Sequence, residues 1–165
     1  MKPSLVVNSS PLIALVAALP DFGQLAGLVG RCIIPAEVIA ELVAGGLKDD
    51  TAARVQAARW CEVRPPRPVT PDPLLQRLGA GEAAVIQTAQ DEGLPLVVID
   101  EVRGRRAARL AGLRVIGSLG LIVELHHAGL LDSVEDSIRR MQAKGIHFAP
   151  QLIQMTLAAA REPRP

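Results

Sequence analysis

The sequence predicts an α/β fold in which helices form a layer on each side of a central, mostly parallel sheet, giving three layers, α/β/α. Short, continuously apolar runs such as 5–7 and 96–99 alternate with longer segments that have the pattern of helices. Strands that are apolar on both faces are typical of parallel sheets covered by helices on both sides. The chain has 165 residues, 49% of them hydrophobic, which suits one core. We therefore expect a single domain over residues 1–165.

The elements begin and end at local signals in the sequence. Ser9, Ser10 and Pro11 cap and open the first helix, and Pro20 ends it. The expected strands are 5–7, 32–34, 61–63, 96–99 and 114–116. The expected helices are 9–19, 24–29, 35–43, 52–60, 82–92, 103–110, 118–127, 133–144 and 150–161.

The segment 65–73 carries five of the chain's 13 prolines. Proline lacks a backbone donor and fixes φ, so this segment can be neither a helix nor a central strand. We expect an extended surface connection rather than a domain boundary, because neither side has enough residues for its own core.

Composition argues against several kinds of site and location. Aromatic residues make up 2% of the chain, which disfavours platforms that stack bases. The net charge is +1, so any attraction for nucleic acid must be local. Cys32 and Cys61 are expected to be reduced, mostly buried thiols of a cytoplasmic protein, and they form no zinc-type spacing with the histidines. No apolar run is long enough to predict a membrane span.

Four polar side chains are expected at one edge of the sheet. Asn8 and Asp100 are the first polar residues after their strands, and ligands of parallel sheets bind beyond the carboxyl ends of the strands. Glu82 opens a helix that runs antiparallel to the next strand, so its first turn lies at the same edge. Glu41 lies nearer the apolar stripe of its helix than Glu37 does, which favours Glu41. Several carboxylates without zinc-type ligands predict a Mg²⁺ or Mn²⁺ site, and such sites usually act on phosphate esters.

Simpler roles exist for the same residues. Asp100 could cap the helix that follows it, as Asp often does. The helix dipole favours a carboxylate in a first turn, such as Glu82, whatever its function. Glu41 could belong to a solvated face together with Glu37. At Asn8, the amide removes a negative charge from the place where a metal would need it.

Basic residues gather in the segment after Asp100. They are Arg103, Arg105, Arg106, Arg109 and Arg114. Arginine-rich helices are commonly solvated surfaces, but beside a metal site the guanidinium groups can hold phosphates through paired hydrogen bonds. The sequence therefore favours a substrate with a phosphate backbone, with Arg103, Arg105 and Arg106 as binding residues.

The order of these motifs resembles that of a PIN domain. The segments that carry the resemblance are 6–13, 33–42, 81–89, 98–113 and 117–130, and together they cover residues 5 to about 157. The similarity extends to a prokaryotic PIN-like group whose first motif reads Asn-Ser/Ala-Ser/Thr-Pro-Leu-Ile, as residues 8–13 do here.

PIN domains are metal-dependent nucleases that act mostly on RNA, and many are toxins held inactive by an antitoxin protein. The resemblance implies that Glu41, Glu82 and Asp100 are acidic ligands of Mg²⁺ or Mn²⁺, with Glu101 as an extra or alternative ligand. It implies that Ser9 or Ser10 assists at the substrate. It also implies a homodimer.

Asn8 stands where an active PIN nuclease has Asp. An amide oxygen can coordinate a hard cation, but it adds no negative charge. Two hypotheses follow: a metal-dependent endoribonuclease, or a catalytically weakened or inactive PIN-fold protein that binds RNA or a protein partner. We expect Asn8→Asp to distinguish them, because an otherwise intact site would regain activity. A nucleotide-binding α/β protein of another kind is a third reading, and the lack of a glycine-rich phosphate fingerprint counts against it.

Overall fold

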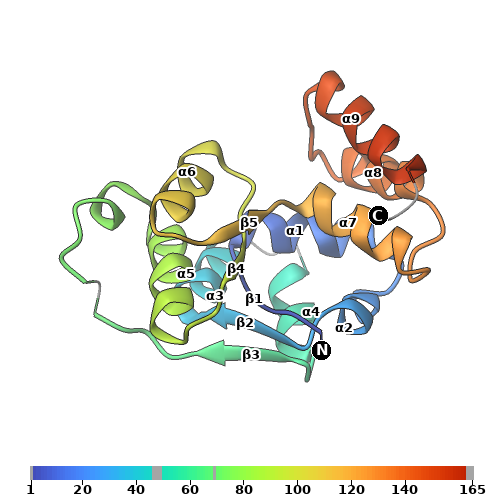
Figure 1. Cartoon of the computed structure of the whole chain (residues 1–165). Helices are drawn as coiled ribbons and strands as arrows, with labels where there is room; N and C mark the ends of the chain where they lie inside the picture. The colour runs from blue at the N-terminus through green and yellow to red at the C-terminus, as the bar shows by residue number, and fades with distance from the viewer. Residues whose placement is uncertain (1, 46–49, 69, 163–165) are drawn as a thin grey trace.

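A computed structural model describes residues 2–45, 50–68 and 70–162. Its sheet has five strands, all parallel, in the order β3-β2-β1-β4-β5 (Figure 1). The strands are β1 (Ser4–Val7), β2 (Arg31–Pro35), β3 (Cys61–Arg64), β4 (Leu96–Val98) and β5 (Arg114–Ile116). The predicted parallel sheet is confirmed, and it is parallel throughout the described part of the chain.

Helices cover both faces of this sheet (Figure 1). They are α1 (Ser9–Ala18), α2 (Gln24–Leu28), α3 (Ala36–Ala44), α4 (Thr51–Ala57), α5 (Ala80–Asp91), α6 (Val102–Leu110), α7 (Ser118–His127), α8 (Val134–Ala143) and α9 (Pro150–Arg161), with a 3₁₀ turn η1 (Leu75–Arg77). On one face, α5 packs on β1, β2 and β4, and α6 packs on β5. On the other side α1 packs against α4, α7 and α8, and α3 contacts both α1 and α5. The three-layer α/β/α prediction is confirmed.

The central strands are buried from both sides. Leu5, Val6 and Val7 of β1 and Val97 and Val98 of β4 have no exposed surface. Burial on both faces explains why these runs show no alternation of polar and apolar residues. The register pairs Val7 with Val98, so β1 and β4 end at the same level. The residues that follow them therefore emerge at one edge, which we call the carboxyl edge.

The element boundaries lie within two residues of the prediction except at the end of α4, and α5 begins at Ala80 rather than at Glu82. Helix α4 ends at Ala57 rather than at residue 60, because Trp60 leaves the helical path to pack on Phe22, with ring centroids 5.0 Å apart. Pro35 is the last residue of β2 and the N-cap of α3 rather than its first helical residue. The turn η1 was not predicted, and it buries Leu75.

The proline-rich connection has no helix or strand over 65–68 and 70–73, as expected, and Val69 lies outside the described residues. Gln87 of α5 anchors it by accepting a hydrogen bond from Thr70 N (3.1 Å) and donating one to Pro68 O (2.9 Å). The assignment of residues 1–165 to one domain stays a prediction. Within the described ranges, no helix is long and apolar enough to cross a membrane.

The two cysteines, far apart in the sequence, lie opposite each other on β2 and β3. Both are free thiols, with Cys32 buried and Cys61 partly buried. A hydrogen bond with Cys61, together with burial, raises the pKa of the Cys32 thiol well above its ordinary value. Cys32 therefore stays protonated and unreactive at neutral pH.

Candidate active site at the carboxyl edge

Asn8 is the innermost polar residue of the carboxyl edge. It follows β1 directly, its backbone N–H donates to Val98 O (3.0 Å), and only 2% of its surface is exposed. Helix α1 begins at the next residue, with Asn8 as its N-cap, but the Asn8 side chain does not cap the helix. The side chain is therefore available to neighbours across the edge.

Glu101 is the neighbour that Asn8 contacts. Asn8 Nδ2 donates to Glu101 Oε2 (3.4 Å), and Ser10 Oγ donates to Glu101 Oε1. Glu101 holds the N-cap position of α6, yet its carboxylate turns back to α1 instead of capping its own helix. Asn8 Oδ1, the other polar atom of the amide, is buried and has no hydrogen-bond partner among the residues that the structure describes. A buried acceptor without a donor is rare in folded proteins and is a position that a cation can satisfy.

Glu41 links the two helical layers. From α3 its Oε2 accepts a hydrogen bond from Ser9 Oγ (2.7 Å), and its Oε1 accepts one from Gly81 N (2.8 Å). Gly81 lies in the first turn of α5, where free N–H groups and the helix dipole attract a carboxylate. A Cβ at Gly81 would lie 2.5 Å from Glu41 Oε2, so the approach requires glycine.

Glu82 closes the start of α5. Its Oε2 accepts from Gly79 N (3.2 Å) in a capping box. Its Oε1 points towards α6, where a Cβ at Gly104 would lie only 2.5 Å away. Glu82 therefore caps its own helix, a role that the sequence did not single out, and its second oxygen is directed towards α6, the helix for which Glu101 is the N-cap.

Asp100 is bound to α7 rather than to the helix that follows it. Its Oδ1 accepts from Ser118 N (2.7 Å), the first residue of α7. The suggestion that Asp100 caps the next helix is wrong, because Glu101 is the N-cap residue of α6. Burial raises the pKa of the Asp100 carboxyl above its ordinary value, and the negative charge of Glu101 adds to this.

The carboxylates are neighbours along the edge but do not converge on one point. In the described ranges, no group of three or more His, Cys, Asp or Glu side chains is arranged to hold a metal ion. The structure brings Glu101 to Asn8 and Ser10, and Glu41 to Ser9. The possible metal ligands at this edge are oxygens, and one of them, Asn8 Oδ1, has no hydrogen-bond partner in the described ranges. That chemistry fits a hard cation such as Mg²⁺ or Mn²⁺, while the roles of the individual residues as metal ligands stay a prediction.

The predicted basic residues divide into two places. Arg105 Nη1 donates to Ile99 O (2.8 Å), which fixes its guanidinium beside the end of β4. Arg103 Nη2 donates to Arg77 O (2.8 Å), so η1 adds Arg77, a basic residue that the sequence did not single out. Arg114 is the first residue of β5 and lies at the opposite edge of the sheet, so its inclusion in the cluster was wrong.

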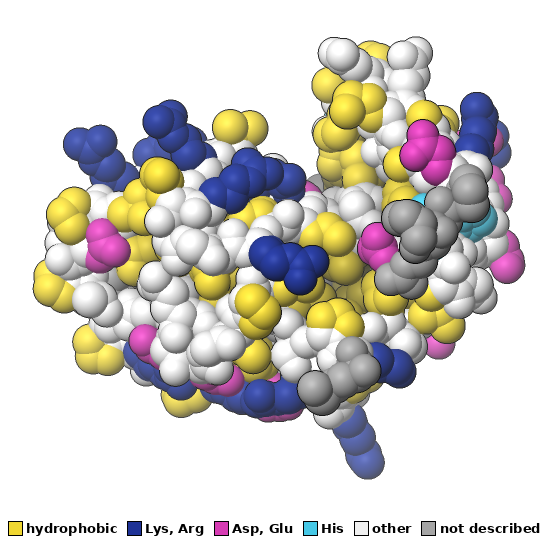
Figure 2. All heavy atoms as spheres, in the orientation of Figure 1, with side chains coloured by type: hydrophobic (Ala, Val, Ile, Leu, Met, Phe, Trp, Pro, Cys, Tyr) yellow, Lys and Arg dark blue, Asp and Glu magenta, His cyan; other side chains and the backbone are white. Residues whose placement is uncertain are grey.

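Figure 2 shows basic side chains gathered over the part of the surface where η1 and α6 lie in Figure 1. Arg103, Arg106 and Arg109 are exposed and form no salt bridge with any residue that the structure describes. Their charges are therefore free to act on an external anion.

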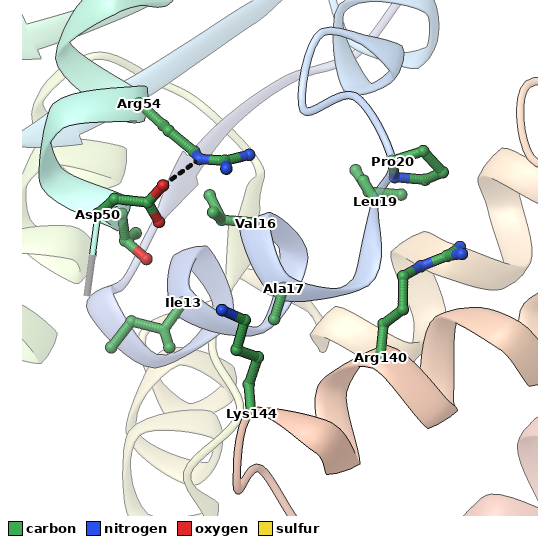
Figure 3. A pocket seen from close by; sticks show the side chains of 10 residues that line it. Ile13, Val16, Ala17, Leu19, Pro20, Asp50, Arg54, Arg140 and Lys144 are labelled. Carbon is green, nitrogen blue, oxygen red and sulfur yellow. Dashed lines mark hydrogen bonds and ion pairs between the residues drawn. The ribbon is translucent and has the colours of Figure 1, made fainter. Parts of the chain in front are cut away.

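A separate cavity of about 480 Å³ lies between α1, α4 and α8 (Figure 3). Its apolar wall includes Ile13 and Ala17, and Arg54, Arg140 and Lys144 supply basic groups. Arg54 Nε also donates to Asp50 Oδ2 (2.7 Å). None of the acidic residues predicted for the carboxyl edge lines this cavity.

Comparison with known proteins identifies the family. A family model, DUF3368, described as a PIN domain, matches residues 4–162. No protein of curated function matches this chain. The match spans the sheet, both helical layers and every residue of the carboxyl edge described above. The chain therefore belongs to the PIN domain family.

Proposed function

We propose that this protein is a PIN-family endoribonuclease that hydrolyses phosphodiester bonds in RNA with Mg²⁺ or Mn²⁺. The observation that carries the proposal is Asn8 Oδ1, which is buried and has no hydrogen-bond partner within the described part of the chain, at an edge that also carries the carboxylates of Asp100 and Glu101. Membership of the PIN family supports a nuclease in general. The basic surface of α6 supports a substrate with a phosphate backbone.

Each residue of the edge has a role in this proposal. Asn8, Asp100 and Glu101 would hold the cation, and Glu41 and Glu82 would complete the negative edge from α3 and α5. A bound divalent cation would supply charge neutralisation at the phosphate and a lower pKa for water. The catalytic residues are then Asn8, Glu41, Glu82 and Asp100.

In this proposal, positively charged arginine side chains bind the phosphates of the RNA substrate. Arg103 and Arg106 of α6 present guanidinium groups that bind phosphate oxygens in pairs, and Arg105 is fixed beside Asp100 by its bond to Ile99 O. Ser9 and Ser10 supply hydroxyl groups at the start of α1, each already oriented by a carboxylate.

The direct test is cleavage of a mixed single-stranded RNA pool by the purified protein with Mn²⁺ and with EDTA. We expect cleavage that requires the metal and is lost in Asp100→Asn. Glu41→Gln should also lower the rate, whereas Glu37→Gln on the same helix serves as the matched control. Cleavage that persists in EDTA, or that Asp100→Asn leaves unchanged, would contradict the proposal.

The second candidate is a PIN-fold protein that binds RNA or a protein partner without cutting. It is favoured by Asn8 and by the cavity of Figure 3, where basic groups surround an apolar wall. A folded protein that binds RNA but does not cleave it in Mn²⁺ would support this candidate. The family resemblance further suggests a cytoplasmic toxin with an antitoxin partner and a homodimeric state. Size-exclusion chromatography with light scattering tests the homodimer.

A further inference from the structure

We propose that Glu101 supplies the negative charge that Asn8 lacks, so that Asn8 Oδ1 and the Glu101 carboxylate act together as one cation-binding pair. The inference rests on the proposed function in that it concerns the same cation. In this chain the carboxylate that contacts position 8 comes from the N-cap of α6, across the carboxyl edge from the end of β1.

The first observation is the way Glu101 is held. Asn8 Nδ2 and Ser10 Oγ donate to its two oxygens, one donor to each. Residues at an N-cap usually turn towards their own helix, but Glu101 makes no such bond. The two donors from the β1–α1 junction therefore fix its carboxylate against Asn8.

The second observation is independent of any carboxylate. Asn8 is 98% buried, and its Oδ1 has no hydrogen-bond partner among the described residues. Because Nδ2 is committed to Glu101, the amide cannot turn over without bringing Oδ1 against the carboxylate. An acceptor oxygen is thus left without a donor on the amide whose nitrogen contacts a carboxylate, and amide and carboxylate oxygens are ligands that a hard cation binds.

The pairing explains why an amide stands at position 8. In Asn8→Asp an oxygen would replace Nδ2, 3.4 Å from Glu101 Oε2, and two carboxylates would repel each other in a partly buried place. In the double variant Asn8→Asp/Glu101→Gln, the glutamine amide can donate to the new carboxylate. The total charge is unchanged, and the two groups have exchanged places.

The test measures Mn²⁺ binding by isothermal titration calorimetry and thermal unfolding in EDTA. We compare the wild type, Glu101→Gln, Asn8→Asp and the double variant, with Glu135→Gln on α8 as a surface control. Glu101→Gln should weaken Mn²⁺ binding about tenfold or more, and the double variant should regain most of that loss. Asn8→Asp alone should unfold at a lower temperature in EDTA and recover on addition of Mn²⁺.

Several results would overturn the pairing. They are a wild type that binds no Mn²⁺, a Glu101→Gln variant that binds it as well as the wild type, or a double variant as weak as Glu101→Gln. If Asn8→Asp does not fold, Ser10→Ala provides the second test. It removes one of the two donors to Glu101 and should weaken binding about tenfold, and unchanged binding would count against the pairing.

These readouts are separable from nuclease activity. Mn²⁺ binding with the expected pattern, but without RNA cleavage, would refute the ribonuclease and support the pair. RNA cleavage in Mn²⁺ that Glu101→Gln leaves unchanged would refute the pair and leave the ribonuclease intact.

Discussion

The contact between Glu41 and Gly81 can be tested by its effect on stability. In Gly81→Ala the added Cβ would lie 2.5 Å and 2.6 Å from the two oxygens of Glu41. The end of a glutamate side chain can swing away, so the clash itself is relieved. What is lost are the hydrogen bonds of Glu41 to Gly81 N (2.8 Å) and Ser9 Oγ (2.7 Å).

The magnitude follows from two opposing terms. Hydrogen bonds to a charged group contribute about 1.5–3 kcal/mol each when shielded, but Glu41 is exposed, so we take about 1 kcal/mol for the pair. Replacing glycine by alanine within a helix gains about 0.5–1 kcal/mol. The single variant Gly81→Ala should therefore change the free energy of unfolding by less than about 0.5 kcal/mol.

Gly81→Ala is expected to stabilise the protein clearly only once Glu41 is removed. In a Glu41→Ala background no carboxylate opposes the new methyl group, so Gly81→Ala should stabilise the protein by about 0.5–1 kcal/mol. Denaturant unfolding of the wild type, both single variants and the double variant gives the coupling energy, which we expect to be about 1 kcal/mol. A coupling energy below about 0.3 kcal/mol would show that the two residues do not interact in this way.

Three further predictions concern other parts of the molecule. Ser133→Ala removes the bond from Asp136 N to Ser133 Oγ (3.1 Å) and should destabilise α8 by about 1 kcal/mol in denaturant unfolding. Hydrogen bonds from Arg31, and then from Arg64, lower the pKa of Glu62 from 4.5 to about 2. Because the folded-state pKa is the lower one, the ion pairs of Glu62 stabilise the fold fully above pH 4.5, and this contribution is lost as the pH falls towards 2. In urea unfolding, the free energy of unfolding of Arg64→Gln should be lower than that of the wild type, and this difference should shrink as the pH falls from 4.5 towards 2. Arg106→Gln should weaken RNA binding and reduce the slope of log K against log salt by about 0.7.

Each of these three has a clear contrary result. An unchanged free energy of unfolding in Ser133→Ala would show that the hydrogen bond from Asp136 N to Ser133 Oγ does not stabilise α8. A deficit in Arg64→Gln that stays constant down to pH 2 would show that Glu62 does not titrate against these arginines. An unchanged salt dependence in Arg106→Gln, equal to that of Arg139→Gln on α8, would remove α6 from the proposed RNA-binding surface.

The fold could be predicted because its signals are local. The buried strands β1, β2 and β4 appear as short apolar runs, and prolines and glycines mark where helices begin or end. The errors occur where contacts distant in sequence decide the outcome. Trp60 lies outside α4 and packs on Phe22, 38 residues earlier in the chain. The turn η1 buries Leu75 in the core. Neither contact has a periodic signature.

The location of the site could be predicted, but its internal contacts could not. Parallel topology alone places Asn8 and Asp100 at one edge. The hydrogen bond from Gly81 N to Glu41 spans 40 residues, and that from Ser10 to Glu101 spans 91. One signal was available: Gly81 lies in the first turn of a helix, where glycine is unfavourable and often marks a close approach.

The contact between Asn8 and Glu101 reverses an expectation drawn from the sequence. On the sequence alone, Asn8→Asp restores the carboxylate of an active PIN nuclease and should raise activity. In the structure the amide at position 8 donates to Glu101, so the new carboxylate would face an existing one at about the 3.4 Å that now separates Nδ2 and Oε2. We therefore predict that Asn8→Asp alone lowers the rate of metal-dependent RNA cleavage at limiting Mn²⁺, because the two groups push each other out of position. The double variant Asn8→Asp/Glu101→Gln should cleave faster than Asn8→Asp. If Asn8→Asp cleaves RNA as fast as the double variant or faster, the asparagine at position 8 only removes a metal ligand, and Glu101 does not compensate for that loss.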